Sequence, residues 1–109
     1  MRHYTQNVDC LEDLTGLERS KTVQAHGHLR TGSCLYCKKK FTIDYIKACI
    51  EKNDTVIPEC DVCPDKPAIK PDVVLFGENL PSEFVRNTEY DFNKCDLLIV
   101  MGTSLVVKP

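Results

Sequence analysis

Hydrophobic and polar positions follow one another differently in three parts of the chain. In residues 1–31 short polar motifs dominate, and Leu11, Leu14 and Leu17 recur at every third position. This spacing predicts one or two helical turns. The polar residues 6–9 are therefore expected on the loop that enters those turns.

The second part, residues 32–68, combines paired cysteines with an amphipathic stretch. A helix is predicted over residues 44–52, with Asp44 as its N-cap. Its apolar face is formed by Ile46, Cys49 and Ile50. We expect Cys49 to belong to the core.

The third part, residues 69–109, reads as strand, helix, strand. The continuous apolar runs 73–76 and 97–101 are typical of strands covered on both faces of a parallel sheet, and residues 82–92 suit a helix between them. The second strand is followed by Gly102-Thr103-Ser104. A glycine turn after a buried strand can receive a nucleotide, although many α/β proteins share this signal. The pattern predicts an α/β fold with part of a parallel sheet.

The length and composition indicate one small domain with a small hydrophobic core and no strongly charged surface. The sequence has 109 residues, 42% hydrophobic and 28% charged, with a net charge of −2. Residues 38–40 are the only tight basic cluster and suit a solvated turn, so no direct nucleic-acid partner is expected. No apolar leader or membrane-length run is present. We expect an intracellular protein of the cytoplasm or nucleus, with reduced thiols.

Four of the seven cysteines form two close pairs, Cys34 with Cys37 and Cys60 with Cys63. Two residues between the members of a pair allow both sulfurs to face one ion, and two pairs complete the tetrahedral S4 shell that zinc prefers. Because four thiolates leave no open position, the predicted zinc site is structural. A redox CxxC is the competing interpretation, but it needs only one pair.

His26 is the candidate general base, because a neutral imidazole can accept a proton near pH 7 and the following glycine permits close approach of a substrate. A single histidine is also often an ordinary surface or core residue. Gln6, Asn7 and Asp9 carry amide and carboxylate groups suited to a polar cofactor, but they could equally cap the following helix.

Five motifs in one order resemble the sirtuin family. They are Tyr4-Thr5-Gln6-Asn7-Val8-Asp9, Ala25-His26-Gly27, the two cysteine pairs, Lys70-Pro71-Asp72-Val73-Val74-Leu75-Phe76-Gly77-Glu78 and Gly102-Thr103-Ser104-Leu105. The Phe-Gly-Glu segment followed by Leu-Pro resembles the eukaryotic deacetylase branch. The resemblance implies a Rossmann-type parallel-sheet domain contributed by residues 1–31 and 69–109, with a small four-cysteine zinc-binding domain at 32–68.

Sirtuins remove acyl groups from protein lysines with NAD as co-substrate, giving nicotinamide, O-acyl-ADP-ribose and the free lysine. By resemblance His26 is the catalytic base. The residues implied for NAD are Gln6 and Asn7 at the nicotinamide ribose, Val8 in the nicotinamide pocket, Asp9 at the carboxamide, and Gly102, Thr103 and Ser104 at the ribose and phosphates. The residues implied for the acyl-lysine substrate are Val74, Leu75 and Phe76 along its channel and Gly77 and Glu78 at its backbone.

The resemblance also implies parts that the 109 residues do not contain, including a glycine loop for the NAD phosphates. We therefore expect the isolated chain to be inactive. Two alternatives stay open: a zinc-stapled interaction fragment without catalysis, and transfer of ADP-ribose to proteins.

Overall fold

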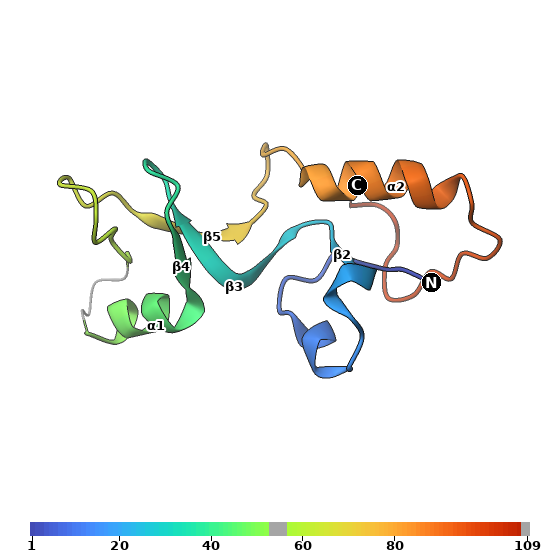
Figure 1. Ribbon diagram of the computed structural model, residues 1–109, viewed down its shortest axis with the longest axis horizontal. Coiled ribbons are helices and arrows are strands. Elements are labelled where there is room, and N and C mark those ends of the chain that lie inside the picture. The colour runs from blue at the N-terminus through green and yellow to red at the C-terminus, as the bar shows by residue number, and fades with distance from the viewer. Residues whose placement is uncertain (53–56, 108–109) are drawn as a thin grey trace.

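A long strand, β3 (Gly27–Cys34), runs through the middle of the molecule and joins two lobes (Figure 1). The computed structural model describes residues 1–52 and 57–107. We call residues 27–52 and 57–73 the cysteine lobe, and residues 1–26 and 74–107 the histidine lobe. The molecule measures 51 × 26 × 25 Å, and its radius of gyration of 16.4 Å exceeds the roughly 13 Å of a compact domain this long.

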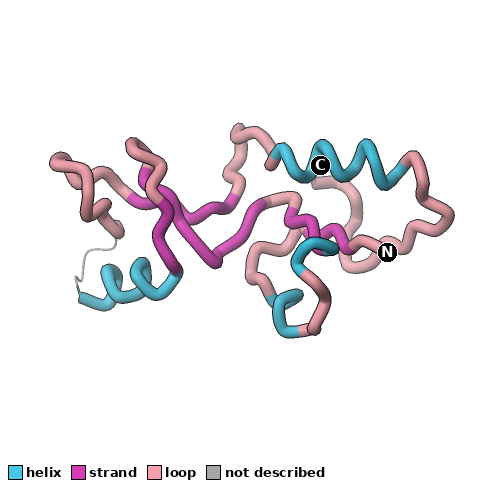
Figure 2. Tube along the Cα trace, in the orientation of Figure 1, coloured by secondary structure: helices cyan, strands magenta, loops and turns pink. Residues whose placement is uncertain are grey.

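The cysteine lobe is built on an antiparallel sheet of strand order β4-β3-β5. β4 spans Lys40–Thr42 and β5 spans Ile69–Val73, and helix α1 (Ile43–Lys52) follows β4 directly (Figure 2). The buried core of this lobe contains Cys34, Phe41, Ile46, Cys60 and Ile69. Two ligand-type cysteines thus belong to the same core as the apolar side chains.

Helix α1 confirms the helix expected at residues 44–52, but its cap differs from the predicted one. Thr42 lies just before the helix, and its Oγ1 accepts a hydrogen bond from the backbone N–H of Tyr45 at 3.3 Å. That is the geometry of an N-cap, so Asp44 lies inside the first turn instead. On the predicted face Ile46 is buried, Cys49 is half-buried and Ile50 is exposed.

The histidine lobe has a parallel pair, β1 (His3–Thr5) with β2 (Thr22–Gln24). Between them lie two short 3-10 helices, η1 (Leu11–Leu14), where helical turns were expected, and η2 (Arg19–Lys21). Helix α2 (Ser82–Phe92) matches its predicted bounds.

Tyr4 fixes β1 against α2. Its ring lies 6.1 Å from the rings of Phe84 and Phe92, and its hydroxyl donates to the Asp91 carboxylate at 2.6 Å. Arg2 adds an ion pair to the same carboxylate. These contacts hold the segment that enters residues 6–9.

The structure contradicts both strands predicted in the third part of the sequence: the first is shifted and antiparallel, and the second is absent. β5 ends at Val73 and pairs antiparallel with β3, while Leu75 and Phe76 lie exposed beyond it. Residues 97–101 form no strand and are exposed. A strand needs a neighbour for its backbone N–H and C=O groups, and none of the described residues offers one to this run.

Among residues 1–52 and 57–107, no helix combines the length and the apolar character that a membrane crossing requires.

Candidate functional site

The four paired cysteines form one cluster in the cysteine lobe. The sulfurs of Cys34, Cys37, Cys60 and Cys63 all lie within 4.8 Å of one another. Sγ of Cys34 is 3.9 Å from Sγ of Cys63, and Sγ of Cys37 is 3.8 Å from Sγ of Cys60. With Zn–S bonds of about 2.3 Å, a tetrahedral site has sulfurs about 3.8 Å apart. The donor set and its spacing therefore fit zinc.

In the first CxxC pair, backbone N–H groups point at a cysteine sulfur and would stabilise its thiolate form. The N–H groups of Tyr36 and Cys37 each donate to Cys34 Sγ at 3.4 Å. Burial acts to raise the pKa of Cys34, but these hydrogen bonds and those with neighbouring thiols lower it to about 6. Burial and the adjacent sulfurs raise the pKa of Cys63 to about 12. A divalent cation would allow all four sulfurs to be thiolates together.

His26 lies at the junction of the two lobes, between β2 and β3. Its Nδ1 is 3.1 Å from the carbonyl oxygen of Gln6. Because a carbonyl only accepts, this hydrogen bond places the proton on Nδ1 and leaves Nε2 as the basic nitrogen of the neutral ring. The backbone of His26 accepts a hydrogen bond from Val74 N at 2.8 Å, which ties it to the segment after β5.

Gly27 permits this junction. Its φ is +74°, and a Cβ built there would lie 2.1 Å from the carbonyl oxygen of Asp72. Any residue type with a Cβ would clash with this carbonyl, so only glycine at position 27 allows β3 and β5 to approach so closely.

A cavity of about 350 Å³ opens beside His26. It brings together six of the residues predicted for catalysis or substrate binding and one predicted for NAD: His26, Val74, Leu75, Phe76, Gly77, Glu78 and Val8. Val73, Leu80 and Val107 complete the lining. Val8 is held there because its carbonyl accepts from Leu29 N on β3 at 3.0 Å. Apart from His26 and Glu78, the side chains around the cavity are apolar.

The residues predicted for NAD are only partly gathered. Gln6 Oε1 accepts from the Thr103 hydroxyl at 3.3 Å, and Gln6 Nε2 donates to the Val107 carbonyl at 3.0 Å. Asp9 Oδ1 accepts from Leu11 N at 3.1 Å, as a turn before η1 requires. Asn7 is exposed, and so are Gly102 and Ser104. Among the described residues, a hydrogen bond thus joins Gln6 to Thr103, and none joins Asn7, Asp9 or Ser104 to that pair.

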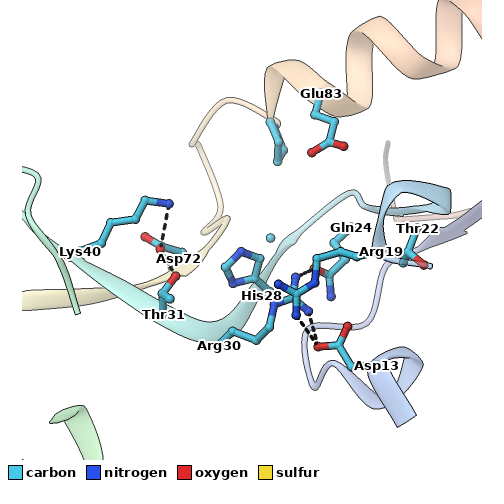
Figure 3. A pocket seen from close by; sticks show the side chains of 12 residues that line it. Asp13, Arg19, Thr22, Gln24, His28, Arg30, Thr31, Lys40, Asp72 and Glu83 are labelled. Carbon is cyan, nitrogen blue, oxygen red and sulfur yellow. Dashed lines mark hydrogen bonds and ion pairs between the residues drawn. The ribbon is translucent and has the colours of Figure 1, made fainter. Parts of the chain in front are cut away.

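A second cavity, of about 410 Å³, is lined by residues of β3 and was not predicted (Figure 3). His28 points into it below Glu83 at the start of α2, with Arg30 and Asp72 on either side. Arg30 is paired with Asp13 at 2.9 Å. Burial first, and then the positive charge of Arg30, lower the pKa of His28, so this imidazole is neutral near pH 7. His26 and His28 thus serve different cavities.

Comparison with known proteins identifies the family. The model of the Sir2 family matches residues 1–109. The chain belongs to the Sir2 family. It is 46% identical over 110 residues to the NAD-dependent deacetylase sir2A of Dictyostelium discoideum. This match covers all of the present chain and 21% of the relative. It is also 46% identical over 110 residues to the NAD-dependent protein deacetylase sirtuin-2 of Danio rerio, with coverage of 99% and 28%.

Solved Sir2 structures share the fold of this Sir2-family chain. A Sir2Tm structure bound to a propionylated peptide has a TM-score of 0.88 at 36% identity, over 99% of this chain and 43% of that one. A Sir2–p53 peptide–NAD+ structure gives a TM-score of 0.88 at 36% identity, with coverage of 100% and 43%. The chain is thus a mixed α/β part of the Sir2 core, with a four-cysteine cluster typical of its zinc-binding module. It spans about a fifth to a quarter of the length of these two curated relatives.

Sequence reasoning assigned no role to Lys70, although it is the first residue of the motif that contains the cavity wall. In the structure its ammonium group contacts Val73 and Glu78 in that wall. The available signal was a lysine and a glutamate on either side of the apolar run 73–76.

Proposed function

We propose that the full-length protein is an NAD-dependent protein-lysine deacetylase and that His26 is its catalytic base. The observation that carries this proposal is the cavity in which His26 meets the apolar residues 74–76. A histidine beside the apolar residues 74–76 suits a neutral acyl-lysine side chain next to a group that takes up a proton.

NAD, when bound, supplies the ribose carbon that accepts the acyl oxygen as nicotinamide leaves. The role of His26 is to take a proton from a ribose hydroxyl through Nε2. The Gln6 carbonyl stabilises the protonated ring that results, because it accepts from Nδ1–H throughout. The hydrogen bond from Val74 keeps His26 beside the substrate wall.

For the cofactor, we propose that Gln6 and Asn7 contact the nicotinamide ribose and that Val8 lines the nicotinamide pocket. Asp9 would accept from the carboxamide N–H groups, and Gly102, Thr103 and Ser104 would contact the ribose and phosphates. The hydrogen bond between Gln6 and Thr103 supports one common site for the two segments.

For the substrate, we propose an apolar channel along Val74, Leu75 and Phe76, with Gly77 and Glu78 at the peptide backbone. The channel residues offer no cation to an acyl carboxylate, and burial of an unpaired charge is costly. The full-length enzyme should therefore deacylate acetyl-lysine and longer fatty acyl-lysine peptides faster than succinyl-lysine peptides. Competition between acetyl and succinyl peptides, followed by mass spectrometry, measures this preference directly.

The cysteine cluster is proposed to hold one structural zinc ion, remote from the chemistry. Zinc held by free thiolates requires a reducing environment, so we propose an intracellular location in the cytoplasm or nucleus.

The isolated 109 residues are proposed to bind without catalysing. Gly102, Thr103 and Ser104 are exposed, whereas positioning of NAD for the reaction requires an enclosed, pre-organised set of donors. A zinc-stapled interaction fragment is therefore the second candidate function for this chain alone. Within the enzyme class, ADP-ribose transfer to protein would use the same His26 cavity.

Product analysis tests the proposed function. The full-length protein is incubated with NAD and an acetyl-lysine peptide, and the products are separated by mass spectrometry. Equal amounts of nicotinamide, deacetylated peptide and O-acetyl-ADP-ribose are expected. Nicotinamide together with ADP-ribosylated peptide, without deacetylated peptide and O-acetyl-ADP-ribose, would favour the transferase. The absence of nicotinamide would refute both enzyme activities.

A further inference from the structure

We propose that Lys70 is a positioning residue: with Glu78, it clamps the segment 73–78 into the shape that receives the substrate peptide. This inference rests on the proposed function and adds a specificity-determining pair to it. Lys70 lies on β5, outside the wall of the His26 cavity, whereas Glu78 and Val73 line that cavity.

The Lys70 ammonium group has three acceptors, two of them on this segment. Its Nζ donates to the carbonyl oxygens of Val73 at 2.6 Å and of Pro71 at 3.3 Å, and to Glu78 Oε2 at 3.0 Å. An ammonium group has three N–H donors, so these contacts use its full capacity. One side chain thus connects the end of β5 to a residue five positions further along the chain.

Glu78 closes the turn from the other side. Its backbone N–H donates to the Leu75 carbonyl at 3.0 Å, and its Oε2 accepts from Leu75 N at 2.9 Å. Gly77 has a φ of +87°, the value a type II turn requires at its third position. Phe76 is then held at the corner of the turn, fully exposed to solvent.

The same carboxylate oxygen therefore serves both Lys70 and Leu75. The hydrogen bond from Leu75 N and then the Lys70 charge lower the pKa of Glu78, so it is ionised at neutral pH. An exposed ion pair adds little to global stability. Its effect here is local, because its donors and acceptors all lie within residues 70–78.

The clamp is coupled to the catalytic side of the cavity. Lys70 holds the carbonyl of Val73, and the next amide, Val74 N, donates to the His26 carbonyl. If the pair is lost, the turn becomes free to leave the geometry that presents Leu75 and Phe76 to the peptide. The peptide must then re-order the turn when it binds, which raises KM more than it lowers kcat.

The test compares Lys70→Met, which removes the charge but keeps the length, with Lys70→Arg, which restores it. Glu78→Gln breaks the pair from the other side, and Lys21→Met is the matched control, because Lys21 pairs with Glu18 in η2 at 3.4 Å. Each change is made in the full-length protein. Three quantities are measured: amide exchange at Leu75 and Glu78 by NMR, the dissociation constant of an acetyl-lysine peptide, and KM and kcat.

We expect Lys70→Met and Glu78→Gln to speed exchange of the turn amides and to raise the peptide dissociation constant and KM by about 3- to 10-fold, the scale of ordering a turn on binding. The double variant should lose no more than the larger single effect, since one interaction is removed. Lys70→Arg and Lys21→Met should stay near the parental values.

Unchanged exchange in Lys70→Met would overturn the clamp, and faster exchange with unchanged peptide affinity would overturn its positioning role. A protein that binds the peptide in a Lys70-dependent way but releases no nicotinamide would refute the proposed function and leave the clamp supported. A parental protein that does not bind the peptide would refute both.

Discussion

The two lobes differ in how fully their apolar side chains are covered. In the cysteine lobe a three-stranded sheet, helix α1 and the cysteine cluster enclose one core, and Phe41, Ile46 and Ile69 are each at most 6% exposed. In the histidine lobe Val23 and Ala25 are buried, but every residue from 97 to 107 is exposed. Apolar residues are present in both lobes, yet only one lobe has enough neighbouring elements to bury them.

This difference separates the source of stability from the site of chemistry. The cysteine lobe carries a closed S4 cluster that fits a structural ion, whereas the catalytic candidate His26 lies where the histidine lobe begins. Small domains often need a metal because their cores are small. We infer that zinc and the core around it stabilise β3 and β5, and that these strands carry the cavity wall.

Removal of zinc should have the largest effect on the stability difference between the two lobes. Metal binding in small zinc peptides is worth about 10 to 16 kcal/mol, so chelation or Cys60→Ser should unfold the cysteine lobe. Hydrogen exchange should show loss of protection in β3, β4 and α1, and metal analysis of the untreated chain should give one zinc per molecule. Cys95→Ser is the control, because Cys95 is exposed and remote from the cluster. Protection that persists without zinc would contradict the structural role.

Truncation of one isoleucine in each lobe should measure how differently the two lobes cover their apolar side chains. Ile46→Ala removes a side chain that is 5% exposed and should cost about 2–5 kcal/mol in unfolding free energy. Ile99 is 68% exposed, so Ile99→Ala should change the free energy by about 0.5 kcal/mol or less. Denaturant unfolding of the zinc-loaded chain measures both. Equal losses would mean that the two lobes are covered alike.

A smaller effect is expected at Asp72, which joins β5 to β3 through the hydroxyls of Thr31 and Ser33. Partial burial acts to raise the pKa of Asp72, but these hydrogen bonds outweigh it and hold the pKa below its usual value. The stabilisation is therefore complete above the unfolded pKa, about 3.9, and is lost as the pH falls through the lower folded pKa.

Asp72→Asn should accordingly cost about 1 kcal/mol at pH 7 and flatten the acid limb of the stability profile. Glu18→Gln, at an exposed pair, is the control. Unfolding curves from pH 2 to 7 measure the effect, and an unchanged acid limb would show that Asp72 does not hold the strands together.

Local signals in the sequence predicted what local interactions determine. Helices α1 and α2 and the turns at Leu11–Leu14 follow from apolar spacing, and the cysteine cluster follows from the CxxC pairs. The cap of α1 was missed because Thr42 and Asp44 are both good capping residues and only the backbone decides between them.

Structure that depends on contacts between distant residues was harder to predict from the sequence. The run 97–101 has a strand-like pattern, but strand formation depends on a partner that the sequence pattern does not specify. The motif residues of the His26 cavity were found through family resemblance, whereas the cavity at His28 became visible only when β3 and β5 were placed side by side. The pair of Lys70 and Glu78 is local in sequence, but only the structure shows that their side chains meet.

The most direct test of the account is the rate of nicotinamide release by the full-length protein with His26→Ala, next to the parental protein and His28→Ala. His26 and His28 are two positions apart but line different cavities, so they form a matched pair. We predict a loss of at least about 100-fold for His26→Ala, the usual scale for removal of acid–base assistance, and near-parental turnover for His28→Ala. Near-parental release by a folded, zinc-loaded His26→Ala protein would contradict the account.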